Sequence, residues 1–283
     1  MQRWDGGLLG ERQAAAVEEW LGTPALLADF SWGQTDTKVL HVAGRDSAVI
    51  VKAGGAANHH IRREIAAHAA YTGPLVDAGR AGRMLFSDRT LNVLVLEYLS
   101  GELVEGSAWE LAADVHFQAG QVLKLLHDQE GRADAEYEAR ATSKALAWLE
   151  REHRINPEVG REVRGRLNSY RPLPVAAVPT HGDWQPRNWL YDAGVVKVID
   201  FGRFEFRPAA SDFCRLSVQQ WVKKPSLETA FLRGYGGDPR DARVWRMDLL
   251  REAVGTAVWA YLVGDEAFEA QGHWMLERAL GRF

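Results

Sequence analysis

Two short polar segments of this sequence contain residue types that could transfer a phosphoryl group. Residues 181–188 have the pattern H-x-D-x-x-x-x-N, and residues 200–202 are an Asp-Phe-Gly that follows an apolar stretch. Phosphoryl transfer needs a carboxylate at the acceptor hydroxyl and oxygen ligands for Mg²⁺ beside the phosphates. We therefore expect Asp183 to face the hydroxyl, and Asn188 and Asp200 to hold the metal.

A purely structural interpretation of these residues stays open at this point. Asp183 and Asn188 belong to types that commonly form turns, and Asp200 could cap the end of a strand. The occurrence of both motifs at this separation nevertheless favours the kinase interpretation, because a short motif gains specificity when its expected context is present.

The two segments resemble the catalytic and metal-binding loops of the aminoglycoside phosphotransferase family, small-molecule kinases that share the eukaryotic protein kinase fold. Gly182 stands where most protein kinases have Arg, and in this the chain is similar to the family. Residues 49–52, Val-Ile-Val-Lys, resemble the V-A-I-K strand, and the resemblance extends over residues 31–216. It implies Mg²⁺ as cofactor and ATP or GTP as co-substrate.

The resemblance also implies three supporting residues. His127 follows Leu126, as in the family's Leu-His pair at the end of a helix, and Asp212 falls where the family has an Asp after the metal loop. Together with His181, they are expected to brace the catalytic loop rather than to react.

The nucleotide requires an ammonium on its phosphates, held by a carboxylate from the adjacent helix. Lys52 fits the first role, and Glu64 is the only acidic residue between Ala53 and Val76. A solvated helix charge is the alternative interpretation of Glu64. The resemblance places the hinge at residues 96–99, where the backbone carbonyl of Glu97 and the backbone amide of Leu99 would bind the base.

The chain departs from the family pattern at two places. The phosphate-covering loop at residues 31–37 lacks G-x-G-x-x-G, so Gly33 is a candidate phosphate contact and a simple polar turn is the alternative. Arg187 replaces the family's usual Gly, and it could contact phosphate or an anionic substrate, or pair with Glu205. Trp184, beside Asp183, is a further candidate for the acceptor site, with Arg187 and Glu205.

The elements that must position these residues change in character along the chain. Residues 38–42, 48–52, 83–86 and 91–98 have strand patterns, and residues 56–71 have a helical one. Beyond residue 101 helical periodicity dominates, interrupted by a β-rich stretch at 178–201. With the resemblance, this predicts an α+β, bilobal, protein-kinase-like fold. A small β-rich nucleotide-binding lobe (residues 1–97) and a hinge (98–102) precede a larger, mostly helical catalytic and substrate-binding lobe (103–283).

Composition excludes several classes of function. The 34 Lys and Arg against 38 Asp and Glu give a net charge of -4, which argues against nucleic-acid binding. No apolar stretch is long enough for a bilayer span, and the first residues lack an export signal, so we expect a cytoplasmic protein without a membrane partner. Cys214 is the only cysteine, which rules out an internal disulfide. His59, His60 and His68 are expected to be solvated helix residues rather than metal ligands.

The sequence thus predicts a small-molecule O-phosphotransferase that moves the γ-phosphate of a nucleoside triphosphate to a substrate hydroxyl. Inactivation of an antibiotic of the aminoglycoside or nucleoside type is the use that the resemblance suggests first. A metabolite kinase for choline, homoserine or a sugar is the alternative. A protein kinase and a non-catalytic nucleotide-binding module are rivals from other classes.

Overall fold

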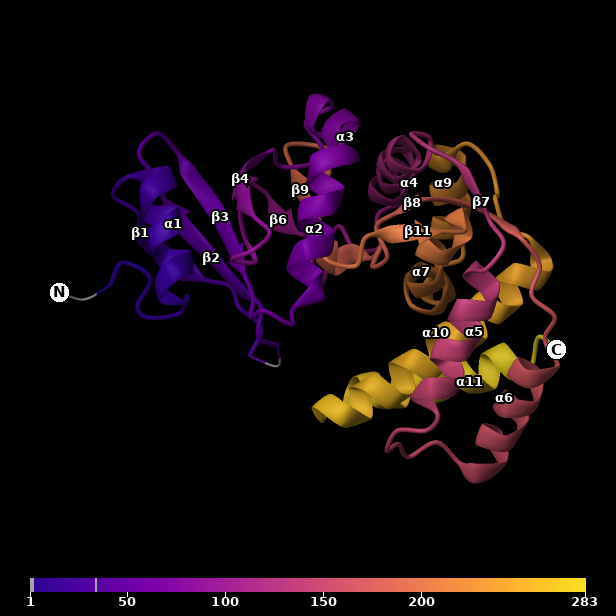
Figure 1. Ribbon diagram of the computed structural model, residues 1–283. Coiled ribbons are helices and arrows are strands. Elements are labelled where there is room, and N and C mark those ends of the chain that lie inside the picture. The colour runs from indigo at the N-terminus through magenta and orange to yellow at the C-terminus, as the bar shows by residue number, and fades with distance from the viewer. Residues whose placement is uncertain (1–2, 34) are drawn as a thin grey trace. The chain divides into compact units, whose positions relative to one another are not determined.

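The computed structural model describes residues 3–33 and 35–283 (Figure 1). The chain forms two compact units. The first unit contains the residues up to Gln129, His181–Glu205 and Ser226–Gly236, and the second contains Glu130–Thr180, Phe206–Pro225 and Gly237–Phe283. The division into lobes at residues 1–97 and 103–283, with a hinge at 98–102, stays a prediction.

The first unit is built on a five-stranded antiparallel sheet with the strand order β1-β2-β3-β5-β4. The strands are β1 (Ala25–Asp29), β2 (Lys38–Ala43), β3 (Ala48–Ala53), β4 (Met84–Asp88) and β5 (Val93–Glu97). Since side chains alternate between faces, Leu40, Val49 and Val51 pack with helix α1 (Glu11–Leu21) in one core cluster. Ile50 and Leu96 belong to a second cluster with helix α2 (His59–Ala70).

Helix α2 is fixed at its start by a side-chain cap. Asn58 accepts hydrogen bonds from the backbone amides of His60 and Ile61, which satisfies two of the free donors at the helix start. Ile61, Glu64 and Ile65 share the buried face of the helix. A carboxylate on this face needs a partner, because burying an unpaired charge is costly.

The first unit contains seven further elements among its described residues. They are α3 (Gly73–Asp77), β6 (Glu102–Leu103), α4 (Ala113–His127), η1 (Pro186–Asn188), β9 (Trp189–Asp192), β10 (Val195–Val198) and α9 (Ser226–Tyr235). Helices α4 and α9 approach closely at Gly234, where an added Cβ would lie 1.9 Å from the carbonyl oxygen of Phe117. Only glycine permits this contact.

The second unit is mostly helical and carries a small sheet with the order β11-β8-β7. Its elements are β7 (Arg132–Asp134), α5 (Tyr137–Trp148), α6 (Pro157–Ser169), β8 (Val175–Thr180), β11 (Glu205–Arg207, whose last two residues belong to this unit), η2 (Ala209–Phe213), α7 (Cys214–Val218), α8 (Gln220–Lys223), α10 (Ala242–Val263) and α11 (Glu266–Leu280). Helix α10 contributes Arg251, which pairs with Glu138 at 2.6 Å and with Asp248 at 3.3 Å inside the unit.

The predicted elements correspond to observed ones with a few differences. The predicted hairpin at 38–52 is β2 and β3, and the helix predicted over 56–71 is α2. The helical pattern predicted beyond residue 101, outside 178–201, is wrong at Arg132–Asp134, because these residues pair with β8 as a strand. Among residues 3–33 and 35–283, no helix combines the length and hydropathy needed to cross a membrane.

Candidate active site

The segment 181–188 connects β8 to β9 and is held by the imidazole of His181. This side chain is fully buried. Its Nε2 lies 3.0 Å from the carbonyl oxygen of Ile199, and its Nδ1 accepts from the amide of Asp183 at 3.3 Å. Because Nδ1 accepts, Nε2 carries the proton and donates to Ile199. Gly182 has φ 81°, a left-handed conformation that favours glycine at this position.

Three side chains of the same segment orient the carboxylate of Asp183, which is 4% exposed. Gln185 Nε2 donates to Oδ1 at 2.6 Å, and Arg187 Nη2 donates to Oδ2 at 2.6 Å. Asn188 Nδ2 donates to the carbonyl oxygen of Asp183 at 2.8 Å and to Oδ2 at 3.2 Å. The carboxylate is therefore fixed in one orientation before any substrate binds.

Lys52, Glu64 and Asp200 form a second charged group, on the side of the sheet that packs with α2. Lys52 Nζ lies 2.8 and 2.9 Å from the two carboxylate oxygens of Glu64 and 3.0 Å from Oδ1 of Asp200. The Lys52 and Glu64 side chains are 8% and 2% exposed, whereas that of Asp200 is 51% exposed. The predicted ion pair between Lys52 and Glu64 is thus present in the structure.

The electrostatics of this group follow from burial and mutual charge. Burial by itself would lower the pKa of Lys52, but the charges of Asp200 and Glu64 raise it above its ordinary value. The ammonium of Lys52 lowers the pKa of Asp200, whereas burial raises the pKa of Glu64. Lys52 therefore stays positive and Asp200 negative at neutral pH.

Asp200 is one of three non-glycine residues with a positive φ, at 67°, among residues 3–33 and 35–283. Such a backbone costs energy and persists only where its surroundings hold it. The next residue, Phe201, holds this backbone in place. Its amide donates to Glu64 Oε1 at 3.3 Å, and its ring packs on His181 with 4.9 Å between centroids.

Two of the histidines that the sequence suggests are solvated instead contact the Asp-Phe-Gly segment. His60 Nδ1 lies 3.0 Å from the carbonyl oxygen of Gly202, and the ring of His68 meets Phe201 edge-on at 5.2 Å between centroids. Burial lowers the pKa of His68 to about 3, so its imidazole is neutral. The expectation of solvated histidines was wrong for both, because α2 turns this face toward the segment 200–202.

Asn188 and Asp200 offer the oxygen ligands that Mg²⁺ prefers. Within residues 3–33 and 35–283, no cluster of three or more His, Cys, Asp or Glu side chains could form a metal cage. Mg²⁺ in nucleotide-using enzymes is commonly held by only one or two protein oxygens, with the phosphates completing its shell. The side-chain nitrogen of Asn188 donates to the carbonyl oxygen of Asp183, so the side-chain oxygen is the atom of this amide that could bind a metal. The donor set therefore fits a nucleotide-bound Mg²⁺.

The predicted base-binding residues lie at the end of β5. The carbonyl oxygen of Glu97 faces Gly82, where an added Cβ would lie 2.8 Å away. The side chain of Glu97 accepts from the amide of Arg83 at 3.0 Å. Leu99 follows in the chain and is partly exposed. A glycine at position 82 thus leaves room beside the Glu97 carbonyl.

The predicted phosphate-covering segment is only partly described, because Gln34 lies outside the described residues. Gly33 is exposed in a turn in which the amide of Thr35 donates to the carbonyl of Trp32 at 3.2 Å. Asp36 accepts from the amide of Gly55 at 3.1 Å and from Asn58 Nδ2 at 2.6 Å. This segment is therefore tied to the start of α2.

The three candidates for the acceptor site have different surroundings. Trp184 is 1% exposed and packs against His181 and Trp189, so it offers almost no surface to an acceptor. Arg187 pairs with Asp183 rather than with Glu205. The carboxylate of Glu205 is half-exposed, 3.9 Å from Arg63.

The two remaining supporting candidates are buried. His127, at the end of α4, has its Nδ1 2.9 Å from the hydroxyl of Tyr235 on α9. Asp212 is 2% exposed in η2 of the second unit. Their supporting roles remain predictions.

Sequence reasoning missed Gln185, one of the three side chains that donate to the Asp183 carboxylate. The only available signal was its place two residues after Asp183, inside the motif. It also missed the hydrogen bond between Asn58 and Asp36, because this contact depends on how close segment 31–37 lies to α2 in the folded chain.

Comparisons with known proteins bear on the fold and the family of the chain. A search of curated protein sequences gives no match. The structure is similar to choline kinase LicA from Streptococcus pneumoniae, with a TM-score of 0.67, 14% identity and coverage of 96% of this chain and 100% of that one. It is also similar to macrolide 2'-phosphotransferase MphH from Brachybacterium faecium, with a TM-score of 0.58, 16% identity and coverage of 94% and 96%.

A third similar structure is aminoglycoside phosphotransferase APH(4)-Ia in a ternary complex with ADP and hygromycin B. The TM-score is 0.63, the identity is 13%, and the coverage is 95% of this chain and 97% of that one. These likenesses establish the protein-kinase-like fold. The model of the phosphotransferase enzyme family, APH, matches residues 29–245, and the chain therefore belongs to that family.

Proposed function

We propose that this protein transfers the γ-phosphoryl group of ATP or GTP to a hydroxyl of a small molecule. The observation that carries the proposal is the fixed carboxylate of Asp183, held by Gln185, Arg187 and Asn188. A carboxylate with this degree of orientation suits a catalytic base, because positioning supplies much of the rate in phosphoryl transfer.

Each charged residue has a role in the proposed reaction. Lys52, held by Glu64, binds the α- and β-phosphates, and the backbone at Glu97 and Leu99 binds the base. Asp183 accepts the proton of the acceptor hydroxyl. The hydroxyl oxygen forms a bond to the γ-phosphorus, and the bond between that phosphorus and the oxygen that bridges it to the β-phosphate breaks. Mg²⁺, held by Asn188 and Asp200, would neutralise charge on the phosphates.

An antibiotic of the aminoglycoside or nucleoside type is the acceptor class that we propose first. Its support is the aminoglycoside phosphotransferase among the similar structures, which was crystallised with hygromycin B. A metabolite kinase is the second candidate, because the choline kinase gives a TM-score of 0.67.

Three features argue against the rival classes. Gly182 has a left-handed backbone where most protein kinases use an Arg side chain. A non-catalytic nucleotide-binding module would not need Asp183 to be oriented by three donors. Lys52, Glu64, Asp183, Asn188 and Asp200 are all present.

The test is a turnover assay with ATP or GTP, with Mg²⁺ or excess chelator, over a panel of aminoglycosides, nucleosides, choline, homoserine, sugars and a generic protein substrate. We expect Mg²⁺-dependent phosphorylation of one small-molecule class. Asp183→Ala should lower turnover by about 10²–10⁴ with nucleotide affinity retained, because Asp183 meets the acceptor.

The matched control is Asp128→Ala, which removes an exposed aspartate paired with Lys124 in the same unit. Its turnover should equal that of the wild type. Near wild-type turnover in Asp183→Ala, or phosphorylation of protein substrates alone, would contradict the proposal.

A further inference from the structure

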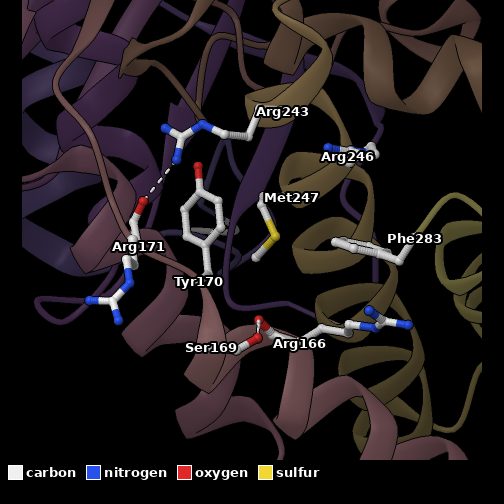
Figure 2. Close-up of a pocket in the computed structure, with 8 residues that line it drawn as sticks. All are labelled: Arg166, Ser169, Tyr170, Arg171, Arg243, Arg246, Met247 and Phe283. Atoms are coloured by element: carbon white, nitrogen blue, oxygen red, sulfur yellow. Dashed lines mark hydrogen bonds between the residues drawn. The ribbon is translucent and has the colours of Figure 1, made fainter.

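A pocket rich in arginine lies in the second unit, between the end of α6 and the start of α10 (Figure 2). Its volume is about 310 Å³, and none of the eight residues that line it is acidic. Four of them are arginines: Arg166, Arg171, Arg243 and Arg246. The residues that we assign to catalysis, nucleotide and metal all belong to the first unit, so none of them lines this pocket.

One wall of the pocket is held rigidly by Tyr170. Its hydroxyl donates to the carboxylate of the buried Glu138, which pairs with Arg251 at 2.6 Å. The Tyr170 ring lies against two guanidinium groups, with Arg251 at 5.2 Å and Arg243 at 5.0 Å from its centroid. Arg243 Nη1 also donates to the carbonyl oxygen of Arg171 at 2.8 Å, as the dashed line in Figure 2 shows. Arg243 is therefore positioned by a ring and a carbonyl.

The opposite wall is the ring of Phe283. The guanidinium groups of Arg166 and Arg246 lie 5.2 and 5.7 Å from its centroid. Figure 2 shows the side chain of Arg171 directed away from the other three arginines. Three guanidinium groups, from Arg166, Arg243 and Arg246, thus define the charge of the pocket.

These charges have little compensation from the protein itself. Within residues 3–33 and 35–283, Arg166 alone of the three has a carboxylate within 4.0 Å, that of Glu162 at 3.5 Å, and both side chains are substantially exposed. Asp241, next to α10, caps the helix by accepting from the amides of Arg243 and Val244, and its carboxylate also interacts electrostatically with Arg243. Like charges gathered in this way repel one another, and a bound anion would relieve the repulsion.

We propose that this pocket binds an oxyanion of the phosphate class, either inorganic or as the phosphate group of a larger molecule. Guanidinium groups match phosphate oxygens with paired hydrogen bonds, and a tetrahedral phosphate can accept from several of them at once. The net charge of -4 means that this cluster is not a consequence of a basic composition.

Calorimetric titration of the full chain with inorganic pyrophosphate, at constant ionic strength, tests the proposal. Lys52→Ala removes the phosphate-binding lysine of the proposed active site, so binding that persists in this variant comes from elsewhere. In that background, Arg243→Ala and Arg246→Ala should each weaken binding by about tenfold, because each removes a charge-assisted contact. Arg161→Ala, an exposed arginine of α6 that lies outside the pocket, is the matched control and should bind as before.

A second pair of variants separates a shaped site from simple attraction. Arg243→Lys and Arg246→Lys keep the charge but lose the planar fork, so their affinity should fall between those of the parent and the alanine variants. Lysine variants that bind pyrophosphate as tightly as the parent would overturn the proposal. A loss of all binding in Lys52→Ala would also overturn it. Binding of an acidic peptide but not of pyrophosphate would assign the pocket to a protein partner and also overturn it. Titration with a phosphorylated sugar would distinguish a phosphate carried on a larger molecule from free phosphate.

Discussion

At the scale of single residues, Arg187 is the most informative departure from the family pattern. Its guanidinium lies 2.6 Å from Asp183 Oδ2 and also interacts electrostatically with Asp200. Burial lowers the pKa of Arg187, but these negative charges outweigh it and raise the value. We therefore interpret Arg187 as a residue that positions the proposed base.

Arg187→Ala should lower kcat by about tenfold, because the Asp183 carboxylate loses one of its three donors. Nucleotide affinity should change little, and Arg187→Lys should recover part of the loss. Steady-state kinetics and nucleotide titration measure the two effects. Arg63→Ala, which removes the arginine beside Glu205, serves as control; an equal loss there would mean that surface charge, and not positioning, is responsible.

The residues that we propose for catalysis could be located from the sequence because their signal is local. The motif places Asp183 and Asn188 five residues apart. Glu64 is the only acidic residue in the sequence of α2, the helix that follows the strand with Lys52. The contacts of His60 and His68 with residues 200–202 were not predictable, because they depend on how α2 is rotated toward a segment far along the chain. The burial of Trp184 likewise follows from packing that the motif does not encode.

At the scale of elements, the pair α4 and α9 depends on Gly234. Gly234→Ala should lower the free energy of unfolding by on the order of 1–3 kcal/mol, since the added Cβ would overlap the Phe117 carbonyl. Gly255→Ala in α10 is the control, because a Cβ there meets nothing within 4 Å, and it should be neutral or stabilising by up to about 1 kcal/mol. Urea denaturation compares the two; similar effects would contradict the close-packing argument.

Helix α10 carries a buried acid whose ionisation opposes folding. Burial raises the pKa of Asp248 to about 7; Arg251 opposes this rise and Glu138 adds to it. Since the folded pKa exceeds the ordinary value of 3.8, the contribution of Asp248 to stability should be greatest at low pH and fall as the pH rises from about 4 to 7.

Asp248→Asn cannot ionise, so its stability relative to the wild type should improve by on the order of a few kcal/mol between pH 4.5 and pH 8. Urea unfolding at the two pH values measures this difference. Thr256→Ala, another buried polar residue of α10, controls for general effects on the helix. Parallel pH profiles for Asp248→Asn and the wild type would show that Asp248 is ionised in both states.

The secondary structure was predictable where one periodicity persists, as in α2 and α10. Secondary structure was not predictable in short segments whose conformation depends on pairing or packing with another element. Residues 132–134 form a strand only through pairing with β8, and α1 packs on the sheet through Ala14, Val17 and Leu21, a stripe too weak in apolar content to predict a helix.

At the scale of the whole molecule, the proposed functions divide along the chain. All residues that we assign to the nucleotide belong to the first unit, and the family model ends at residue 245. We expect acceptor selectivity to depend on the later helices, because specific sites are grafted onto shared folds.

Replacing residues 241–283 by the corresponding segment of a relative with a different acceptor should shift acceptor preference without changing the choice between ATP and GTP. Competition assays with paired acceptors and paired nucleotides measure both. A changed nucleotide preference with an unchanged acceptor preference would contradict this division.

The contact between Lys52 and Asp200 has a consequence for how cations enter the site. The ammonium of Lys52 is a counterion 3.0 Å from Oδ1 of Asp200. It cannot diffuse away, because it is covalently part of the chain and also pairs with Glu64. A tethered ion has a high effective concentration, so a cation from solution competes with it at a disadvantage. In the proposed reaction, a nucleoside triphosphate would offer the ammonium a new anion and free the carboxylate. Loading of the site would then be an ion exchange, in which arrival of the nucleotide would make Asp200 available to metal.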